Sequence, residues 1–371
     1  MQVFNVEIFD RNFNFIHNYT VENIVYKFDY LTPVENEVTI SNNSALAIGQ
    51  YIVLTSVDTR FEGVISSLQI INENYIRVGY YPLNSLFNMD IFIDNRLQQG
   101  GENQGTKSIE SIIYDNLNNL FINGYSIAVP YYWTSGQDDL QKIPGLTLTK
   151  TTDTMLWMIG LTDAEYGGAF GGNNVQLNIY NDLIPAALKG CSVGVITRLD
   201  VEAKKVYCTI GVLNSTTQKI EADLPQILTK NIVENDTSLM CNKYVFCWPS
   251  ETGLAPTVYY RHSDGTWNTT NTDRITPVIT TIETAYSDMY EGDSIPVRLF
   301  KKYGALKYVN LIELTTINNV YDLEFGDIAQ IICGNSQYES MLTGYEINAN
   351  TIKYIFGMIR LDLTKILKRR L

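Results

Sequence analysis

Histidine and cysteine, which supply most metal sites and much acid–base catalysis, are scarce in this chain of 371 residues. Only His17 and His262 are present, which excludes a histidine-rich metal centre and leaves little histidine for proton transfer. The five cysteines are odd in number and contain no CxxC pair, so they indicate neither a disulfide framework nor a zinc site. We interpret them as reduced packing residues, and we predict no metal and no cofactor.

Basic residues are also few. Lys and Arg total 27 against 40 Asp and Glu, which gives a formal net charge of −13 and a pI near 4.7. Sequence-specific binding of nucleic acid requires a basic surface, so this composition argues against it. The chain also lacks an apolar run of the ~18 residues that span a membrane, and its start lacks the features of a signal peptide. We therefore expect a soluble protein that stays in the compartment where it is made.

Charged residues make up 18% of the chain, below the roughly 25% usual for soluble domains, whereas aromatic residues reach 12%. Two interpretations remain open. A surface short of charge and rich in Tyr is typical of a chain with several protein interfaces. Aromatic residues are equally typical of β-strands, so the same composition fits a β-rich protein.

The first hundred residues alternate apolar and polar positions with a period of two, between short turn segments. The pattern predicts strands at residues 3–9, 13–17, 24–30, 37–41, 51–56, 62–71 and 75–80. Short strands without a helical pattern favour a small barrel or sandwich. A polar, glycine-containing linker at residues 98–105 then marks the end of the first domain.

The middle of the chain has a mixed α+β pattern. Apolar residues recur every three or four positions over residues 108–122, which predicts an amphipathic helix. Further helices are predicted at residues 179–188 and 294–303, a hairpin at 192–211, and strands at 244–247 and 258–261. The period of two returns in strands at residues 310–314, 328–333, 340–347 and 351–356.

A three-strand pattern occurs twice. Gly49, Phe61 and Gly79 of the first copy align with Gly326, Tyr338 and Gly357 of the second, at an offset that is the same for the first two positions and one longer for the last. We expect Gly49 and Gly326 to occupy matching turns where a positive φ or a close backbone approach excludes a side chain. The hairpin at residues 3–17 is the candidate counterpart of the hairpin at 192–211.

The predicted fold class is mainly β with α+β side domains: two related small β-barrel domains plus inserted domains. The boundaries follow from the linker and the repeat. We predict a first barrel at 1–105, a side domain at 106–190, a discontinuous second barrel at 191–220 and 308–371, and an inserted side domain at 221–307. Two related barrels in one chain would let three chains form a six-fold pattern.

Signals for catalysis are weak. The glycine-rich segment at residues 167–172 lacks the strand-to-helix context of a phosphate-binding loop. Nothing in the sequence positions or desolvates the acidic residues in loops as an acid–base pair, so we interpret them as solvated: Asp138, Asp139, Asp288, Glu291 and Asp293. His262, beside an Asp-Gly turn, is interpreted as structural. No catalytic residues and no enzymatic activity are therefore predicted.

Several short motifs together resemble a known family. They are YYRHSDGT at residues 259–266, RITPV at 274–278, NLIEL at 310–314, FGDI at 325–328, GMIRLDLTKIL at 357–367, and the opening VEIFDRNFN at 6–14. In these stretches the chain resembles the tail-hub proteins of siphophages, relatives of the baseplate hub of contractile phages. The resemblance extends over nearly the whole chain.

This resemblance implies two barrel domains, two side domains and a homotrimer whose barrels form a pseudo-six-fold ring under the tail tube. The implied partners are a second copy of the chain, a distal tail protein or tail tube ring, the tape-measure protein, and tip fibres or receptor-binding proteins. DNA would pass through without specific binding, and the protein would lie at the virion tail tip after assembly in the bacterial cytoplasm. Many relatives carry a C-terminal peptidase or fibre module, whereas this chain stops shortly after Gly357.

Two other functions remain open at this stage: a glycan hydrolase acting on the cell envelope, and a receptor-binding tail protein. The second could use tryptophans to stack on sugars, although tryptophans are more often core residues: Trp133, Trp157, Trp248 and Trp267. The segment at 361–371 combines an apolar face of Leu363, Ile366 and Leu367 with basic residues opposite. We predict that this face docks on a neighbouring protein.

Overall fold

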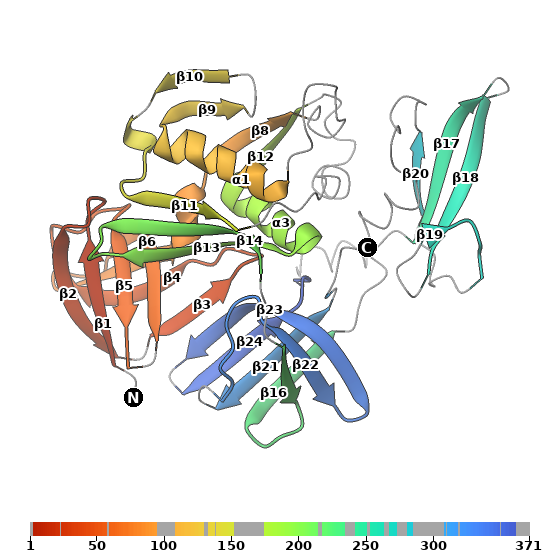
Figure 1. The fold of residues 1–371 in the computed structure, drawn as a ribbon. Coiled ribbons are helices and arrows are strands. Elements are labelled where there is room, and N and C mark those ends of the chain that lie inside the picture. The colour runs from red at the N-terminus through yellow and green to blue at the C-terminus, as the bar shows by residue number, and fades with distance from the viewer. Residues whose placement is uncertain are drawn as a thin grey trace.

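A computed structural model shows a mainly β protein, which confirms the predicted fold class (Figure 1). The structure describes residues 3–22, 24–57, 59–94, 108–129, 133–137, 139–151, 174–213, 217–233, 242–250, 253–262, 267–272, 280–284, 308, 310–317, 320–348 and 350–360. None of the helices in these ranges combines the length and the hydrophobicity that a membrane-spanning helix needs.

The first barrel domain is a six-stranded antiparallel sheet in the order β2-β1-β5-β6-β7-β4. Its strands are β1 (Val3–Phe9), β2 (Phe15–Glu22), β4 (Asn36–Ser41), β5 (Tyr51–Thr55), β6 (Arg60–Ile70) and β7 (Tyr75–Pro82). The sheet curls until its edge strands β2 and β4 are in contact. Alternate apolar residues point inward, as in β4, and fill the interior of the curled sheet.

The second barrel domain is built around a similar run of three antiparallel strands from the C-terminal part of the chain, β22-β23-β24, which corresponds to β5-β6-β7. Its order is β15-β22-β23-β24-β21-β16. The strands are β15 (Thr217–Glu221), β16 (Ile227–Val233), β21 (Leu311–Ile317), β22 (Ile328–Cys333), β23 (Ser336–Asn348) and β24 (Thr351–Phe356). One further strand, β3 (Val25–Asp29), comes from the N-terminal part of the chain and pairs with β23.

Pairing registers show that the two domains are related. Tyr51 pairs with Val64 between β5 and β6, and Ile328 pairs with Met341 between β22 and β23. Tyr51 and Ile328 are separated by the same number of residues as Gly49 and Gly326, and so are Val64 and Met341. The next pair of strands has the same irregularity at the same place, between Ile65 and Ser67 in β6 and between Leu342 and Gly344 in β23. A shared register and a shared bulge give the two sheets the same local twist.

An α+β layer covers one side of the barrels. Its helices are η1 (Leu83–Phe87), α1 (Ile109–Leu117), η3 (Asn118–Ile122), η4 (Asp139–Gln141), η5 (Ile179–Leu183) and α3 (Ile184–Cys191). Its strands are β8 (Asp90–Asp94), β9 (Tyr125–Val129), β10 (Trp133–Gln137), β11 (Leu146–Lys150), β12 (Asn174–Asn178), β13 (Val193–Asp200) and β14 (Lys205–Val212).

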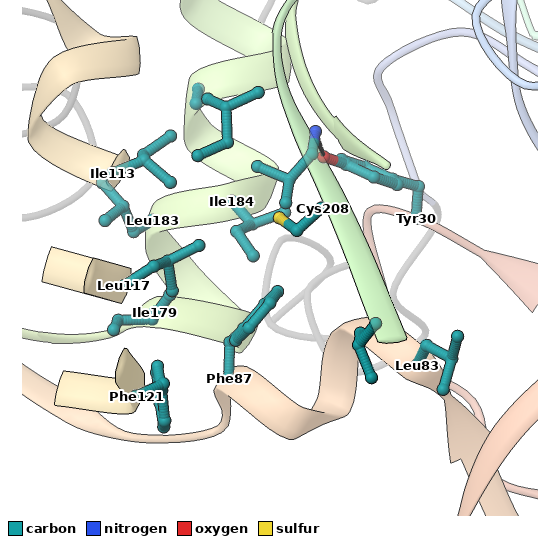
Figure 2. Close-up of a cluster of buried hydrophobic side chains, with 14 of the residues drawn as sticks. Tyr30, Leu83, Phe87, Ile113, Leu117, Phe121, Ile179, Leu183, Ile184 and Cys208 are labelled. Carbon is teal, nitrogen blue, oxygen red and sulfur yellow. Dashed lines mark hydrogen bonds between the residues drawn. The ribbon is translucent and has the colours of Figure 1, made fainter. Parts of the chain in front are cut away.

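Local sequence explains where these helices begin. The Ser108 side chain accepts a hydrogen bond from the Ser111 backbone N–H, which caps α1 at the residue where the predicted helix starts. Pro185 stands in the first turn of α3, where its missing N–H costs nothing. Both helices bury one apolar face in a core that also contains residues of β13 and β14 (Figure 2).

A separate four-stranded sheet has the order β19-β18-β17-β20 and lies to one side of the rest in Figure 1. Its strands are β17 (Lys243–Ser250), β18 (Gly253–Arg261), β19 (Trp267–Asn268) and β20 (Thr280–Thr284). β17 and β18 contain the predicted strands at 244–247 and 258–261. The predicted helix at 294–303 and the linker at 98–105 lie outside the described residues.

The strand partners differ from the expected ones in one region. The hairpin of β13 and β14 pairs with β11 in a three-stranded sheet, and β22 instead pairs with β15, in parallel. The hairpin is therefore not the counterpart of β1 and β2, and that expectation was wrong. β16, which lies inside the predicted insertion, pairs with β21 of the second barrel. The exact domain boundaries stay predictions.

Candidate functional site

The joint between the two barrels is the candidate site, because a single strand links their sheets. β3 pairs antiparallel with β23 from Asp29 opposite Gly344 to Val25 opposite Asn348. It belongs to the first barrel by sequence, and its Tyr26 side chain, with that of the preceding Ile24, fills that barrel's core. Backbone hydrogen bonds of one barrel are therefore completed by a strand whose side chains pack in the other.

Aromatic rings from β3 and the residue after it contact aromatic rings of the second barrel across the joint. The Tyr30 ring stacks on Phe325 with centroids 4.3 Å apart, and the ring centroid of Phe28 lies 5.3 Å from that of Tyr345. Burial raises the pKa of the Tyr345 hydroxyl to about 12, so this hydroxyl stays protonated at neutral pH. Large, rigid rings in contact fix the relative orientation of the two barrels.

Tyr30 also ties the joint to the α+β layer. Its backbone N–H donates to the Thr343 carbonyl at 3.0 Å, and its hydroxyl accepts a hydrogen bond from the Val195 N–H at 2.7 Å. In Figure 2 the Tyr30 ring reaches the layer beside Cys208. The pKa of the buried Tyr30 hydroxyl is raised by desolvation, which favours its neutral, hydrogen-bonded form. Three parts of the fold thus meet at one side chain.

A half-buried ion pair closes the end of β3. Arg360 Nε donates to Asp29 Oδ2 at 2.7 Å and Nη2 donates to Asp29 Oδ1 at 3.0 Å. Nη2 also donates to Thr343 Oγ1 at 2.9 Å, and Nη1 donates to the carbonyls of Gly357 and Ile359, both at 3.0 Å. Every nitrogen of the guanidinium therefore donates to a protein acceptor. Such a bidentate pair is stronger and more directional than a lysine contact.

A groove of about 380 Å³ lies beside the joint, between β3, β6 and β13. Two of its polar side chains already have partners: Glu62 Oε2 accepts from the Leu199 N–H at 2.6 Å, and Asn84 Nδ2 donates to the Val195 carbonyl at 3.0 Å. Much of the remaining lining is aromatic and aliphatic. This chemistry is that of a packed structural contact.

The turns that start the repeated strands are built alike. Gly49 has φ +87° and Gly326 has φ +94°, conformations that favour glycine. The Gly49 N–H donates to the Ile65 carbonyl at 2.8 Å, and the Gly326 N–H donates at 2.9 Å to the carbonyl of Leu342, the counterpart of Ile65 in the second copy. The two predicted glycines therefore stand at equivalent positions.

The residue after each glycine caps its own turn. Gln50 Oε1 accepts from the Ala47 N–H at 2.9 Å, and Asp327 Oδ2 accepts from the Glu324 N–H at 2.8 Å. Both side chains are buried, so the bond satisfies an acceptor that would otherwise lose its water. Sequence reasoning missed these two residues. Their shared position after the glycine was the available signal.

Of the other two predicted pairs of repeat positions, one is equivalent in the structure and one is not. Phe61 pairs with Leu54, and Tyr338 pairs with Ile331, so these two positions are equivalent at the predicted offset. Gly79 and Gly357 are not equivalent: Gly79 pairs with Ser67, whereas the residue paired with Gly344, the counterpart of Ser67, is Ile355. The offset in these last strands is shorter by one, because the loop before the strand has lost one position in the second copy. That part of the predicted alignment was wrong.

The residues considered for catalysis or sugar binding are not brought together. Asp139 is exposed and forms an ion pair with Lys142, and Nε2 of the half-buried His262 lies 3.0 Å from Oδ1 of the exposed Asn268. Trp267 is 3% exposed and cannot present its ring to a sugar. The described part of the chain contains no group of three or more His, Cys, Asp or Glu that could hold a metal ion.

Several other predicted features lie outside the described residues. They are the glycine-rich segment at 167–172, the acids Asp138, Asp288, Glu291 and Asp293, Trp157, and the docking face of Leu363, Ile366 and Leu367. The side chains of Trp133 and Trp248 also lie outside the described set.

No family model matches the chain, and no curated protein matches its sequence. Solved structures do match its fold. The 43 kDa tail protein of prophage MuSo2 from Shewanella oneidensis has a TM-score of 0.51 at 9% identity, over 95% of this chain and 98% of that one. The prophage tail protein gp18 from Listeria monocytogenes has a TM-score of 0.48 at 11% identity, over 99% of this chain and 98% of that one.

A chain of the activated baseplate of phage P2 has a TM-score of 0.48 at 10% identity, over 96% of this chain and 98% of that one. The match to the Shewanella protein shows that the chain has a phage tail protein fold along nearly its whole length. The resemblance seen in the sequence motifs is confirmed at the level of the fold.

Proposed function

We propose that the chain is a structural protein of a phage tail tip: a homotrimeric hub that joins the six-fold tail tube to a three-fold tip. The observation that carries the proposal is the pair of barrels with equal strand register, held together by β3. Closed three-fold symmetry of a chain with two equivalent barrels places six similar units around one axis. The fold likeness to a prophage tail protein supports the same role.

The rigid joint suits this role, because a symmetry adaptor must hold its two barrels in one orientation. β3, the Arg360–Asp29 pair and the contacts of Tyr30 with Thr343 and Phe325 join one barrel directly to the other. Asp139 and His262, which were considered for catalysis, have separate partners away from these contacts. We therefore propose a non-enzymatic function. A zymogram on host cell walls tests this point, and a cleared band would contradict it.

The proposed neighbours are a distal tail protein or tail tube ring on one face, and tip fibres or receptor-binding proteins on the other. The tape-measure protein would contact the hub from inside the tube. We propose that the ring lines or closes the DNA channel and lets DNA pass without specific binding. A net charge of −13 per chain supports this, because a basic lining would retain the phosphate backbone.

Native mass spectrometry of the purified chain and cryo-electron microscopy of assembled tails test the proposal together. We expect three copies per tail tip, with six barrels around the channel and a lining that is neutral or acidic. Hexamers of the chain, or a single copy per tip, would refute the trimeric hub. A lining made mainly of Lys and Arg would refute free passage of DNA while leaving the hub intact.

A further inference from the structure

In the second barrel, one edge of the sheet is covered by strand β3 of the first barrel. β3 pairs with the backbone of β23 at residues 344–348, and its side chains contact Phe325, Tyr345 and Ile347. Phe325 stands beside the turn glycine, and Ile347 is 8% exposed. The surface therefore combines a sheet edge with three apolar residues, and the strand that covers it belongs to the preceding barrel.

The first barrel has the same surface, since a single offset relates the two copies from the turn glycine up to the end of β6. Phe325, Tyr345 and Ile347 correspond to Ile48, Leu68 and Ile70. Ile48 is 66% exposed, Ile70 is 70% exposed, and neighbouring Ile71 is also exposed. Ile48 and Ile70 are thus exposed, Leu68 packs in part against the core of the first barrel, and no counterpart of β3 covers these positions among the described residues.

The backbone at this place is an open sheet edge. β5 pairs with β6 only as far as Val64, and from Leu68 to Ile70 the strand pairs with β7 on one side. No strand of the described ranges pairs with its other side. Residues 68–71, Leu-Gln-Ile-Ile, contain neither charge nor proline, the devices by which proteins protect free edges. An unprotected apolar edge indicates a partner that adds a strand.

We propose that residues 68–71 of β6, together with Ile48, bind the second barrel of another copy of this chain by β-strand addition. The inference rests on the proposed trimer and names its contact. Each second barrel is covered by the first barrel of its own chain, so in a ring of alternating barrels the next chain's second barrel adjoins each first barrel. The contact is head-to-tail and closes after three copies.

The added strand pairs with β6 only as far as Leu68 and does not reach Ser67. Its equivalent, Gly344, lies so close to β3 that an added Cβ would be 2.7 Å from the Phe28 carbonyl oxygen. A serine at this position excludes an approach as close as that of β3 in the second barrel. The contact between chains is therefore one residue pair shorter than the contact within the chain.

The first experiment compares the double variant I48D/I70D with the control V57D. Val57 is 98% exposed and lies in the loop between β5 and β6, away from the proposed surface, so it controls for an added acidic residue. We expect the control to form trimers at the same protein concentration as the unchanged chain. We expect the double variant to need a protein concentration at least about 100-fold higher to form trimers. Circular dichroism and melting temperature show whether each variant is folded.

The second experiment tests the same contact in assembled tails, in case the chain forms trimers only there. A photo-crosslinking amino acid replaces Gln69, and tails are assembled from a mixture of ¹⁴N- and ¹⁵N-labelled chains. We expect crosslinked peptides of mixed label that join Gln69 to residues 308–360. Crosslinks confined to one chain, to another protein, or to no partner would overturn the inference.

The two proposals fail in different ways. A trimer that I48D/I70D leaves unchanged, with no mixed-label crosslink, refutes the contact and leaves the proposed hub standing. An assembled tail without three copies of the chain refutes the hub, and the contact with it.

Discussion

Removing the Arg360 guanidinium tests whether the half-buried ion pair between Arg360 and Asp29 holds β3 in the second barrel. In the variant Arg360→Met the side chain keeps most of its length but loses both bonds to Asp29, the bond to Thr343 and the bonds to the two nearby backbone carbonyls. Asp29 Oδ1 still accepts from the Leu31 and Thr32 N–H groups, at 3.0 and 3.2 Å. The carboxylate therefore loses its charged partner without losing every donor.

The expected loss follows from burial. The side chains of Arg360 and Asp29 are 18% and 12% exposed, so water replaces the lost partner only in part. Breaking a buried pair by removing one partner costs about 3–5 kcal/mol. Because Asp29 keeps two amide donors and some exposure, we expect about 2–4 kcal/mol for Arg360→Met. The double variant with Asp29→Asn should recover part of this loss, since no unpaired charge remains.

Lys27→Met is the matched control. Lys27 and Glu346 form an ion pair between the same two strands, with 3.5 Å between Nζ and Oε1, but both side chains are substantially exposed. A surface pair contributes about 0–1 kcal/mol. The control therefore removes one charge from the same joint with little expected effect.

Hydrogen exchange of the β3 amides measures the free energy of opening at the joint itself. We expect faster exchange in Arg360→Met, by about 30-fold or more, and almost no change in Lys27→Met. Urea unfolding of both variants supplies the global comparison. Equal exchange rates in the two variants would refute the reasoning that the Arg360–Asp29 pair anchors β3.

Three further predictions concern single sites. Gly326→Ala should destabilise the chain more than Gly334→Ala in urea unfolding, because its Cβ would lie 2.7 Å from Leu213 Cδ1, whereas Gly334 faces open space; equal losses would contradict this. Burial raises the pKa of the Cys208 thiol to about 12, so at pH 8 Cys208 should react with a thiol reagent about 1,000-fold more slowly than an ordinary cysteine, with Cys333 as the internal control. The stabilisation that the protonated Cys208 thiol contributes to the free energy of unfolding is complete below the ordinary thiol pKa of 9.0, and it is lost as the pH rises toward 12. Deleting residues 361–371 should leave the barrels folded by circular dichroism and impair tail assembly; normal assembly would count against docking by this segment.

Much of the secondary structure was determined by the sequence alone. Strands β1, β22 and β24 have the bounds that the period of two predicts, and α1 begins after Ser108 as expected. The turns at Gly49 and Gly326 were also predictable, because only glycine adopts their positive φ without strain. These features depend on neighbours within a few residues, so a local pattern carries enough information to predict them.

Strand partnership was decided by the tertiary structure. Nothing in residues 25–29 shows that β3 pairs with β23, which lies near the opposite end of the chain, or that β13 and β14 join β11. Backbone hydrogen bonds are the same for every strand, so the choice of partner depends on which apolar faces pack together in three dimensions. The joint at Arg360 and Asp29 was missed for the same reason. Its residues lie 331 positions apart, and only the completed pair of barrels brings them into contact.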